Sequence, residues 1–272
     1  MTSNILSIAG SDPSGGAGIQ ADLKTFAARG TYGMSVLTAL TAQNTRGVFG
    51  VHFVPAAFVA DQLRAVLDDI QVDAIKIGMI GNAEIAEAIA DILADRPHIP
   101  IVLDPVMVAK GGAPLLEADA VEAVRTRLLP LAALITPNLP EAAALLRRSE
   151  ATDRTEMAVQ ADALRRMGPQ AVLVKGGHLE SAESPDVLID SNGTTWFESP
   201  RLHTRNTHGT GCTLSSAIAA EMGKGSGIAE AVRAAKHYLA TAIERSHELQ
   251  AGSGHGPVHH FHEQWQPAND CR

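Results

Sequence analysis

The stretch SIAGSDPSGGAGIQADLKTF, residues 7–26, joins a short apolar run to an amphipathic segment through a glycine-rich turn. Its periodicity predicts a strand that runs directly into a helix. Such a turn brings unpaired backbone amides and a helix N-terminus to one point, where a phosphate or another polar ligand can bind. A tight turn without a ligand is the alternative. The stretch has no Gly-Lys-Ser/Thr and no clean G-x-G-x-x-G, which excludes a P-loop and disfavours an NAD-dependent oxidoreductase.

The same alternation of apolar runs and amphipathic segments continues along the chain. Strands that alternate with helices of this length predict right-handed crossovers and an α/β fold, with a mostly parallel sheet covered on both faces. We expect strands at Ile5–Ala9, Ser35–Leu40, Ala74–Met79, Ile101–Leu103, Ala133–Thr136 and Ala171–Lys175. We expect helices at Ile19–Arg29, Pro55–Ile70, Ala83–Ala94, Ala118–Leu129, Pro140–Arg148 and Glu156–Met167.

The pattern changes once, after residue 185. Asp186–Asp190 and Thr194–Glu198 flank Ser-Asn-Gly, which predicts a β-hairpin with a tight turn. Two further helices follow, at about Thr213–Met222 and Ile228–His247. No linker, charge block or internal repeat interrupts the chain. We therefore expect one domain over residues 1–272, with a short histidine-containing tail from about 251 to 272.

Composition excludes several classes of protein. The 272 residues carry a formal net charge of −8, which argues against a nucleic-acid binder. Only two cysteines occur, Cys212 and Cys271, so a disulfide framework is not expected and a reducing compartment is favoured. The N-terminus has no basic region ahead of a long apolar run, and no segment approaches the roughly 20 apolar residues that cross a bilayer. We expect a cytoplasmic protein that does not enter the membrane.

Polar residues follow the second predicted strand, in the segment TALTAQNTRGV, residues 38–48. In parallel sheets, ligands bind beyond the carboxyl ends of the strands. The amide of Gln43 offers both a donor and an acceptor, which suits the edge of an aminopyrimidine. For Asn44 and Thr45 we favour a simple loop-capping role.

Two carboxylates follow the ends of two further strands. Asp104 ends a wholly apolar strand, where an isolated carboxylate is costly to bury unless it faces a cation or a wet crevice. Glu141 follows Asn138 by three residues at the start of a helix, which is the spacing of a capping box. A capping role and a role in organising Mg²⁺ can hold together.

Phosphate-binding chemistry is expected at two places. Lys175 ends an apolar strand ahead of two glycines, where its ammonium can neutralise phosphate or simply cap the strand. Gly209 and Gly211 precede a helix predicted to begin near Cys212, so their amides form a candidate anion hole. At such a helix N-terminus, we expect the pKa of the Cys212 thiol to be lowered.

The tail contains four histidines, at positions 255, 259, 260 and 262. Imidazole is a common zinc ligand, but this spacing matches no standard zinc site and no cysteine or carboxylate cluster accompanies it. We therefore disfavour a metal site in the tail.

Eight segments together resemble one enzyme family, in its order and at its spacing. They are AGSDPSGGAGIQADLKTF, TALTAQNTRGV, KIGMIG, VLDPVM, LITPNLPEAAAL, VLVKGGH, NTHGTGCTLSSAIAA and HGPVHHFH. The family is that of the hydroxymethylpyrimidine/phosphomethylpyrimidine kinases of thiamine biosynthesis, in the ribokinase-like superfamily. The resemblance implies a three-layer sandwich, a homodimer, and two successive MgATP-dependent phosphorylations that yield the monophosphate and then the diphosphate of 4-amino-5-hydroxymethyl-2-methylpyrimidine.

The resemblance also implies roles for individual residues. It places Gly209, Gly211 and Cys212 at the anion hole, with Cys212 at the position of the catalytic base. It places Lys175 beside the nucleotide phosphates, and Asp104 and Glu141 at the acidic positions that organise Mg²⁺. Around the pyrimidine it places Gln43, Gly10, Ala17, Met79 and Val106, with Asp22 and Asn44 as neighbours of that pocket.

One feature departs from the wider superfamily. Sugar kinases of this fold carry Asp where Cys212 stands, so the cysteine disfavours a sugar substrate and resembles certain pyridoxal kinases. A pyridoxal/pyridoxamine kinase therefore remains an alternative. A non-catalytic pyrimidine-binding module is a second one, although a pure binder has no need of the phosphate-binding residues.

Overall fold

The structure is a computed structural model that describes residues 1–108, 118–179, 183–202 and 204–265. Eight strands form the central sheet in the order β10-β9-β8-β7-β6-β5-β1-β2. The pairs from β8 through β2 are parallel, and the pairs β8–β9 and β9–β10 are antiparallel. The strands are β1 Asn4–Ala9, β2 Tyr32–Leu37, β5 Ala74–Ile77, β6 Ile101–Leu103, β7 Leu134–Ile135, β8 Ala171–Lys175, β9 Asp186–Asp190 and β10 Gly193–Phe197.

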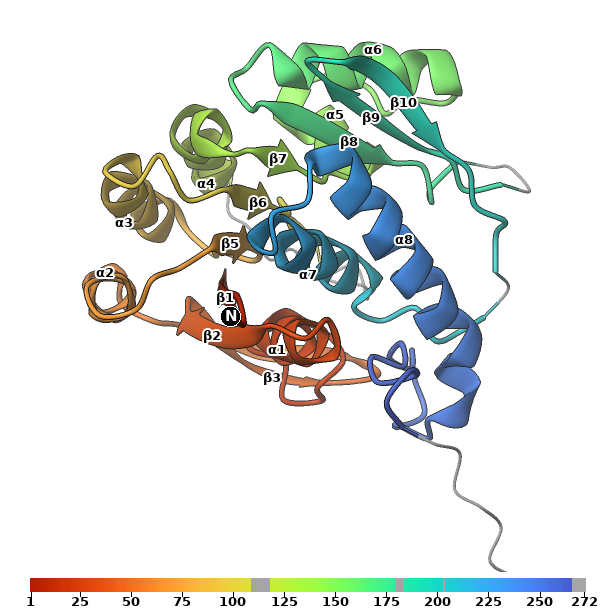
Figure 1. Cartoon of the computed structure of the whole chain (residues 1–272), viewed down its shortest axis with the longest axis horizontal. Helices are drawn as coiled ribbons and strands as arrows, with labels where there is room; N and C mark the ends of the chain where they lie inside the picture. Colours follow the sequence, from red (N-terminus) through yellow and green to blue (C-terminus); the bar gives the residue numbers. More distant parts are fainter. Residues whose placement is uncertain (109–117, 180–182, 203, 266–272) are drawn as a thin grey trace, which may run out of the picture.

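Helices cover both faces of this sheet (Figure 1). One face carries α2 Ala56–Leu67, α3 Ala83–Ala94, α4 Ala118–Ala123, α5 Leu139–Leu146 and α6 Arg154–Arg165. The other face carries α1 Gly18–Ala28, α7 Thr210–Gly223 and α8 Ile228–Glu244. The predicted α/β three-layer architecture and the hairpin β9–β10 are therefore confirmed.

Each face of the sheet has its own apolar core, because side chains alternate along a strand. In β1, Leu6 and Ile8 pack with α2 and α3, whereas Ile5 packs with α1 and α7. The adjoining Ser7 is also buried on the α1 side, where its hydroxyl donates to Asp22 at 2.6 Å. Ser7 and Asp22 thus form a polar contact inside an otherwise apolar core, and they belong to a buried charged network.

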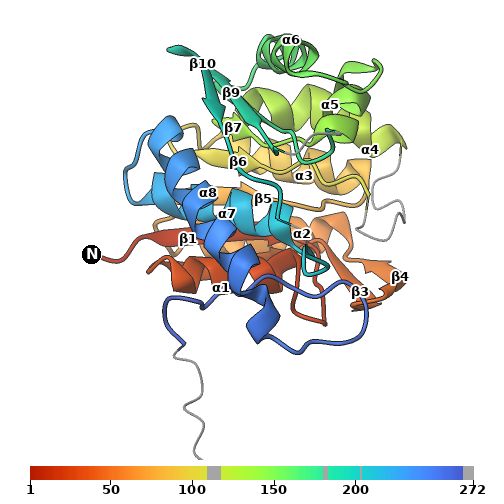
Figure 2. The same cartoon turned by 90° about the vertical axis from the view of Figure 1, so that its right-hand side faces the viewer.

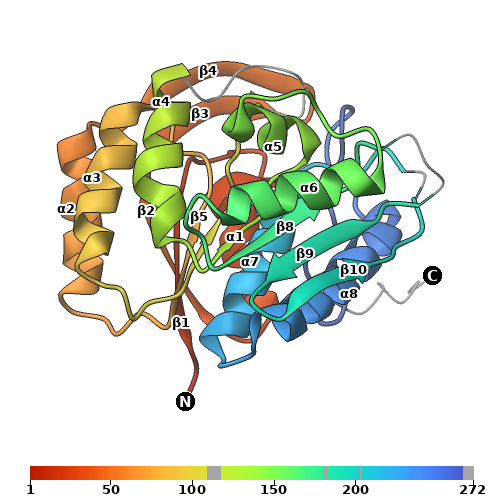
Figure 3. The same cartoon turned by 90° about the horizontal axis from the view of Figure 1, so that it is seen from above.

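Two segments differ from the expected elements. The predicted strand Ser35–Leu40 ends at Leu37, and residues after it form a separate two-stranded antiparallel sheet, β3 Ala39–Asn44 and β4 Gly47–Phe53. Figure 3 shows β3 and β4 at the end of the molecule opposite the N-terminus. This small sheet was missed because its strands are largely exposed: β3 contains polar residues and β4 exposes apolar ones, so neither has the pattern of a buried central strand.

The helix expected over 118–129 is regular only in α4. It continues as a π-helix, η1 Val124–Leu128, and then as a 3-10 turn, η2 Leu129–Leu131. Pro130 explains the break, because it has no backbone N–H to continue the α-helical ladder.

The tail is not a free polar segment up to residue 265. The backbone N–H of His255 donates to the carbonyl of Thr45 at 2.9 Å, and that of His259 donates to Ala242 at 2.9 Å. Between them, the carbonyl of Gly256 accepts from the N–H of His208 at 3.0 Å. The segment 251–265 thus runs past the β3–β4 turn and the start of α7 (Figure 2), and the tail beyond 265 lies outside the described residues, Cys271 included. Among the described helices, none is long and apolar enough to span a bilayer.

Candidate active site

A cavity of about 870 Å³ opens beyond the carboxyl ends of β1, β5, β6 and β8. Because these strands are parallel, the residues that follow them meet at one edge of the sheet. Most residues predicted to bind or act on a ligand line this cavity: Gly10, Ala17, Gln43, Met79, Asp104, Val106, Glu141, Lys175, Gly209, Gly211 and Cys212. Asp22 and Asn44 are not among the lining residues.

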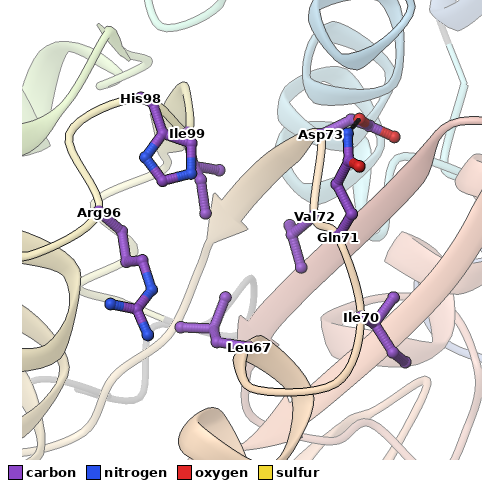
Figure 4. Close-up of a pocket in the computed structure, with 8 residues that line it drawn as sticks. All are labelled: Leu67, Ile70, Gln71, Val72, Asp73, Arg96, His98 and Ile99. Atoms are coloured by element: carbon purple, nitrogen blue, oxygen red, sulfur yellow. Dashed lines mark hydrogen bonds between the residues drawn. The ribbon is translucent and has the colours of Figure 1, made fainter.

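A second, smaller cavity of about 340 Å³ lies at the opposite edge of the sheet. It is formed by the segments that lead into β5 and β6, and Figure 4 shows Arg96, His98 and Asp73 among its side chains. None of the predicted site residues lines it. The large cavity is therefore the candidate active site.

A largely buried ion pair lies in the large cavity beside the N-terminus of α7. Nζ of Lys175 donates to Oδ1 of Asp104 at 2.9 Å and lies 4.0 Å from Oε2 of Glu141. Thr136 donates its hydroxyl to the same Oδ1 at 3.0 Å. Burial alone would raise the pKa of Asp104, but the ammonium groups of Lys175 and Lys76 hold that pKa below its usual value. Asp104 is thus an ionised, oriented carboxylate.

Glu141 forms the predicted capping box with Asn138. Oε2 of Glu141 accepts from the backbone N–H of Asn138, and Oδ1 of Asn138 accepts from that of Glu141, both at 2.8 Å. Burial, together with the nearby Asp104, raises the pKa of Glu141 to about 7 in spite of Lys175. At neutral pH Glu141 is therefore about half protonated, whereas Asp104 is ionised.

The Mg²⁺ that the resemblance implies fits this donor set. Mg²⁺ takes oxygen ligands and commonly uses one or two carboxylates together with substrate phosphates and water. Asp104 and Glu141 would supply the carboxylates. In the described part of the chain, no group of three or more His, Cys, Asp or Glu side chains could hold a metal by itself. The remaining ligands of Mg²⁺ would therefore be nucleotide phosphates and water.

The predicted anion hole is the N-terminus of α7. The helix begins at Thr210, slightly earlier than expected, and Gly209 is its N-cap with φ of 78°. A Cβ on Gly209 would lie 1.8 Å from the carbonyl oxygen of Gly16, so only glycine allows the two glycine-rich turns to touch. A Cβ on Gly211 would meet only Lys175 and Asp104, at 3.4 and 3.5 Å, which places its backbone beside this ion pair.

Cys212 lies in the first turn of α7 and lines the cavity, but the predicted lowering of its pKa is wrong. Burial, together with the carboxylates of Asp22 and Asp104, raises the pKa of the thiol to about 11. The ammonium of Lys76 and the N–H of Gly18 oppose this without reversing it. Loss of solvation therefore outweighs the helix N-terminus at this position.

A buried network missed by the sequence analysis lies beneath Cys212. Lys76 of β5 and Asp22 of α1 are both fully buried, and Nζ of Lys76 lies 2.9 Å from each carboxylate oxygen of Asp22. The hydroxyls of Ser7 and Ser216 donate to the same carboxylate at 2.6 and 2.7 Å. Lys76 lines the cavity, so Asp22 adjoins the cavity through Lys76. A lysine within an otherwise apolar strand was the available signal.

The candidate pyrimidine end of the cavity is lined by Gln43 of β3, Met79 and Gly10. A Cβ on Gly10 would lie 2.2 Å from Cε of Met79, so glycine is needed there for the methionine to pack. Asn44, the next residue of β3, is exposed, and its Oδ1 accepts from the N–H of Arg46 at 2.9 Å. This is the loop-capping role that the sequence pattern predicted for Asn44.

Asp12 and His208 also line this end and were missed. Nε2 of His208 lies 2.7 Å from Oδ2 of Asp12 and 3.5 Å from Nε2 of Gln43. Burial alone would raise the pKa of Asp12, but hydrogen bonds from His208 and Ser14 lower it to about 2. Both residues fall inside the quoted motifs, yet only the fold brings position 12 to position 208.

The chain is similar to known proteins over most of its length. The family model of phosphomethylpyrimidine kinase matches residues 12–259. The hydroxymethylpyrimidine/phosphomethylpyrimidine kinase of Salmonella typhimurium is 54% identical over 263 residues, 96% of this chain and 98% of that protein. A crystal structure of phosphomethylpyrimidine kinase from Clostridium difficile has a TM-score of 0.80 and 43% identity, and covers 89% of this chain and 100% of its own. An ADP complex of Bacillus subtilis pyridoxal kinase has a TM-score of 0.90 and 37% identity, and covers 98% of this chain and 100% of its own.

Proposed function

The chain belongs to the phosphomethylpyrimidine kinase family, and we propose that it phosphorylates hydroxymethylpyrimidine to its monophosphate and then to its diphosphate, with ATP as donor, in thiamine biosynthesis. One observation carries the proposal. A single cavity combines the Asp104–Lys175 pair and the N-terminus of α7 at one end with the amide of Gln43 at the other. A kinase for a small polar ring needs both ends within one site.

The nucleotide is proposed to occupy the part of the cavity between α7 and α8. Leu214, Leu239 and Ile243 supply an apolar surface for a purine there. The triphosphate would then extend toward Lys175 and the amides of 209–212, which bind charge as it develops on the transferring phosphoryl group. Mg²⁺ held by Asp104 and Glu141 would neutralise charge on the phosphate oxygens.

The pyrimidine is proposed to lie against Met79 and Val106, with its amino edge on Gln43. Its hydroxymethyl oxygen would then point toward Cys212 and the α7 N-terminus. In the first step this oxygen bonds to the γ-phosphorus, the bond from that phosphorus to the ADP oxygen breaks, and the thiolate of Cys212 accepts the alcohol proton late in a loose transition state. In the second step the nucleophile is a phosphate oxygen that carries no alcohol proton.

Burial keeps the Cys212 thiol largely protonated near neutral pH, because the pKa is raised to about 11. The proposed base form is therefore a minor population that grows as pH rises. This gives the first phosphorylation a pH dependence that the second does not share.

We also propose a homodimer and a cytoplasmic location. Four apolar side chains of β3, β4 and α2 are exposed, namely Leu40, Phe49, Val51 and Phe58. A second copy would cover such a surface. Light scattering should give twice the 28.5 kDa chain mass, and Phe49→Asp should reduce it toward one chain. The presence of only two cysteines supports a reducing compartment.

A coupled ADP-release assay tests the function, with hydroxymethylpyrimidine, its monophosphate, pyridoxal and ribose side by side. The pyridoxal arm is needed because pyridoxal kinases share the fold at 34–37% identity. We expect kcat/KM to be highest for the two pyrimidines and negligible for ribose. A preference for pyridoxal over both pyrimidines would refute the proposal in favour of the B6 kinase.

A further inference from the structure

His208 and Asp12 form a buried pair that the proposed chemistry does not use. Their side chains are 9% and 2% exposed, and the cavity is lined by both. His208 immediately precedes the N-cap of α7, whereas Asp12 lies in the first glycine-rich turn. The pair therefore joins the turn beside the pyrimidine pocket to the turn beside the phosphates.

The direction of the hydrogen bond follows from the charge on Asp12. An ionised carboxylate can only accept, so Nε2 of His208 must carry the proton in the 2.7 Å contact. The same carboxylate accepts from the backbone N–H groups of Ser14, Gly16 and Ala17, at 2.9, 3.2 and 2.8 Å. Asp12 is thus fixed from several sides, and it fixes the imidazole in turn.

The imidazole has little freedom to move. A Cβ on Gly16 would lie 2.3 Å from Cδ2 of His208, so the ring is packed directly against the glycine-rich turn. The backbone N–H of His208 is held by the carbonyl of Gly256, in the C-terminal segment. The ring is therefore a rigid wall of the cavity.

The amide of Gln43 rests between this wall and Thr41. Its Oε1 lies 3.2 Å from the hydroxyl oxygen of Thr41, and its Nε2 lies 3.5 Å from Nε2 of His208. Because both of these nitrogens carry protons, the second contact is a packing contact and not a hydrogen bond. Thr41 is itself anchored, because its hydroxyl donates to the carbonyl of Ser11 at 2.9 Å. A glutamine side chain otherwise has many rotamers, so two rigid neighbours limit the directions in which the amide can point.

We propose that His208, held by Asp12, is a positioning residue that fixes the Gln43 amide for recognition of the pyrimidine. This inference rests on the proposed function, because it assigns the direction of an amide that is proposed to read that ring. His208 acts through Gln43 and not on the reacting atoms. Its removal should weaken pyrimidine binding about 5- to 30-fold, the range expected when a glutamine side chain must be immobilised on binding.

A double-mutant cycle tests the inference, with the dissociation constant of hydroxymethylpyrimidine measured by calorimetry. The variants are Gln43→Ala, His208→Ala and the double substitution. His208→Ala should weaken binding about 5- to 30-fold when Gln43 is present and less than about 2-fold when residue 43 is alanine. His208→Gln can still donate an Nε2–H to Asp12 and should recover most of the affinity. His260→Ala is the control, since that buried histidine lies elsewhere, with its ring 3.1 Å from the hydroxyl of Thr213.

Equal losses from His208→Ala in both backgrounds would overturn the inference, as would His208→Gln that binds no better than His208→Ala. The KM for ATP should stay within about 2-fold, because the imidazole contacts Asp12, Gly16 and Gln43. A larger rise would mean that His208 shapes the α7 N-terminus instead. If His208→Ala does not fold, as judged by circular dichroism, His208→Asn takes its place in the cycle. Undetectable binding of the pyrimidine to the unmodified protein would refute the proposed function and this inference together, whereas tight binding with additive losses refutes only the inference.

Discussion

Replacing Cys212 with alanine removes the proposed base while leaving the α7 N-terminus in place. With a thiol pKa of about 11, only about one molecule in a thousand carries the thiolate at pH 8. A general base contributes typically about 10²- to 10⁴-fold to a rate. Cys212→Ala should therefore slow phosphorylation of the alcohol by about 10²- to 10⁴-fold and phosphorylation of the monophosphate by less than about 3-fold, because only the alcohol must lose a proton.

The assay measures kcat for each acceptor separately, at saturating ATP, between pH 7 and pH 9. In the unmodified protein the alcohol step should accelerate by up to about 10-fold per pH unit, and this slope should disappear in the alanine variant. Cys212→Ser is the matched control for shape, since its hydroxyl fills the same place and is a far weaker base. Equal slowing of both steps by alanine, or full activity of the serine variant, would refute the base role and leave Cys212 a part of the wall of the anion hole.

Three further predictions follow from the carboxylates, the anion hole and the tail. Asp104→Asn should raise the Mg²⁺ concentration needed for half-maximal rate, and it should lower kcat more than it weakens pyrimidine binding. If Asp104→Asn and Glu141→Gln both leave the Mg²⁺ titration curve unchanged, the metal assignment is contradicted. Gly211→Ala should fold normally, with an unchanged melting temperature, since its Cβ meets only ordinary contacts. It should nevertheless lose most of its kcat, because the methyl group enters the part of the cavity proposed for the phosphates. Full activity would argue against the anion hole. Burial lowers the pKa of His260 to about 3, below that of an unfolded histidine, so the unfolded state binds the extra proton and stability falls as pH drops from about 6.5 toward 3. Denaturant titrations should show that His260→Gln reduces this slope by up to about 1.4 kcal/mol per pH unit, and an identical slope would show that His260 does not titrate between the two states.

The central sheet could be predicted because its strands are buried on both faces. Val102, Leu134 and Val172 belong to nearly continuous apolar runs, which few other elements of this length produce. The sheet β3–β4 could not, because one-sided, half-exposed strands carry polar residues such as Thr41 and Gln43 at cavity-facing positions. The spacing of apolar residues therefore predicts buried strands well, and it predicts half-exposed strands that line a cavity poorly.

The site residues at strand ends could be predicted for the same reason. Asp104 and Lys175 are charged residues at the ends of apolar strands, and both line the cavity as expected. Long-range pairs escaped prediction, because no local pattern relates Asp12 to His208 or Asp22 to Lys76. The error in the direction of the Cys212 pKa has a related cause: the helix N-terminus is visible in sequence, whereas the depth of burial depends on the whole fold.

Following the products formed from hydroxymethylpyrimidine and excess ATP by ³¹P NMR tests the central claim most directly. The proposed function predicts that a monophosphate ester appears first, that it is then converted to a diphosphate, and that two ADP molecules form per pyrimidine. No ADP above background with this acceptor, or a reaction that stops at one ADP with the monophosphate persisting, would contradict it.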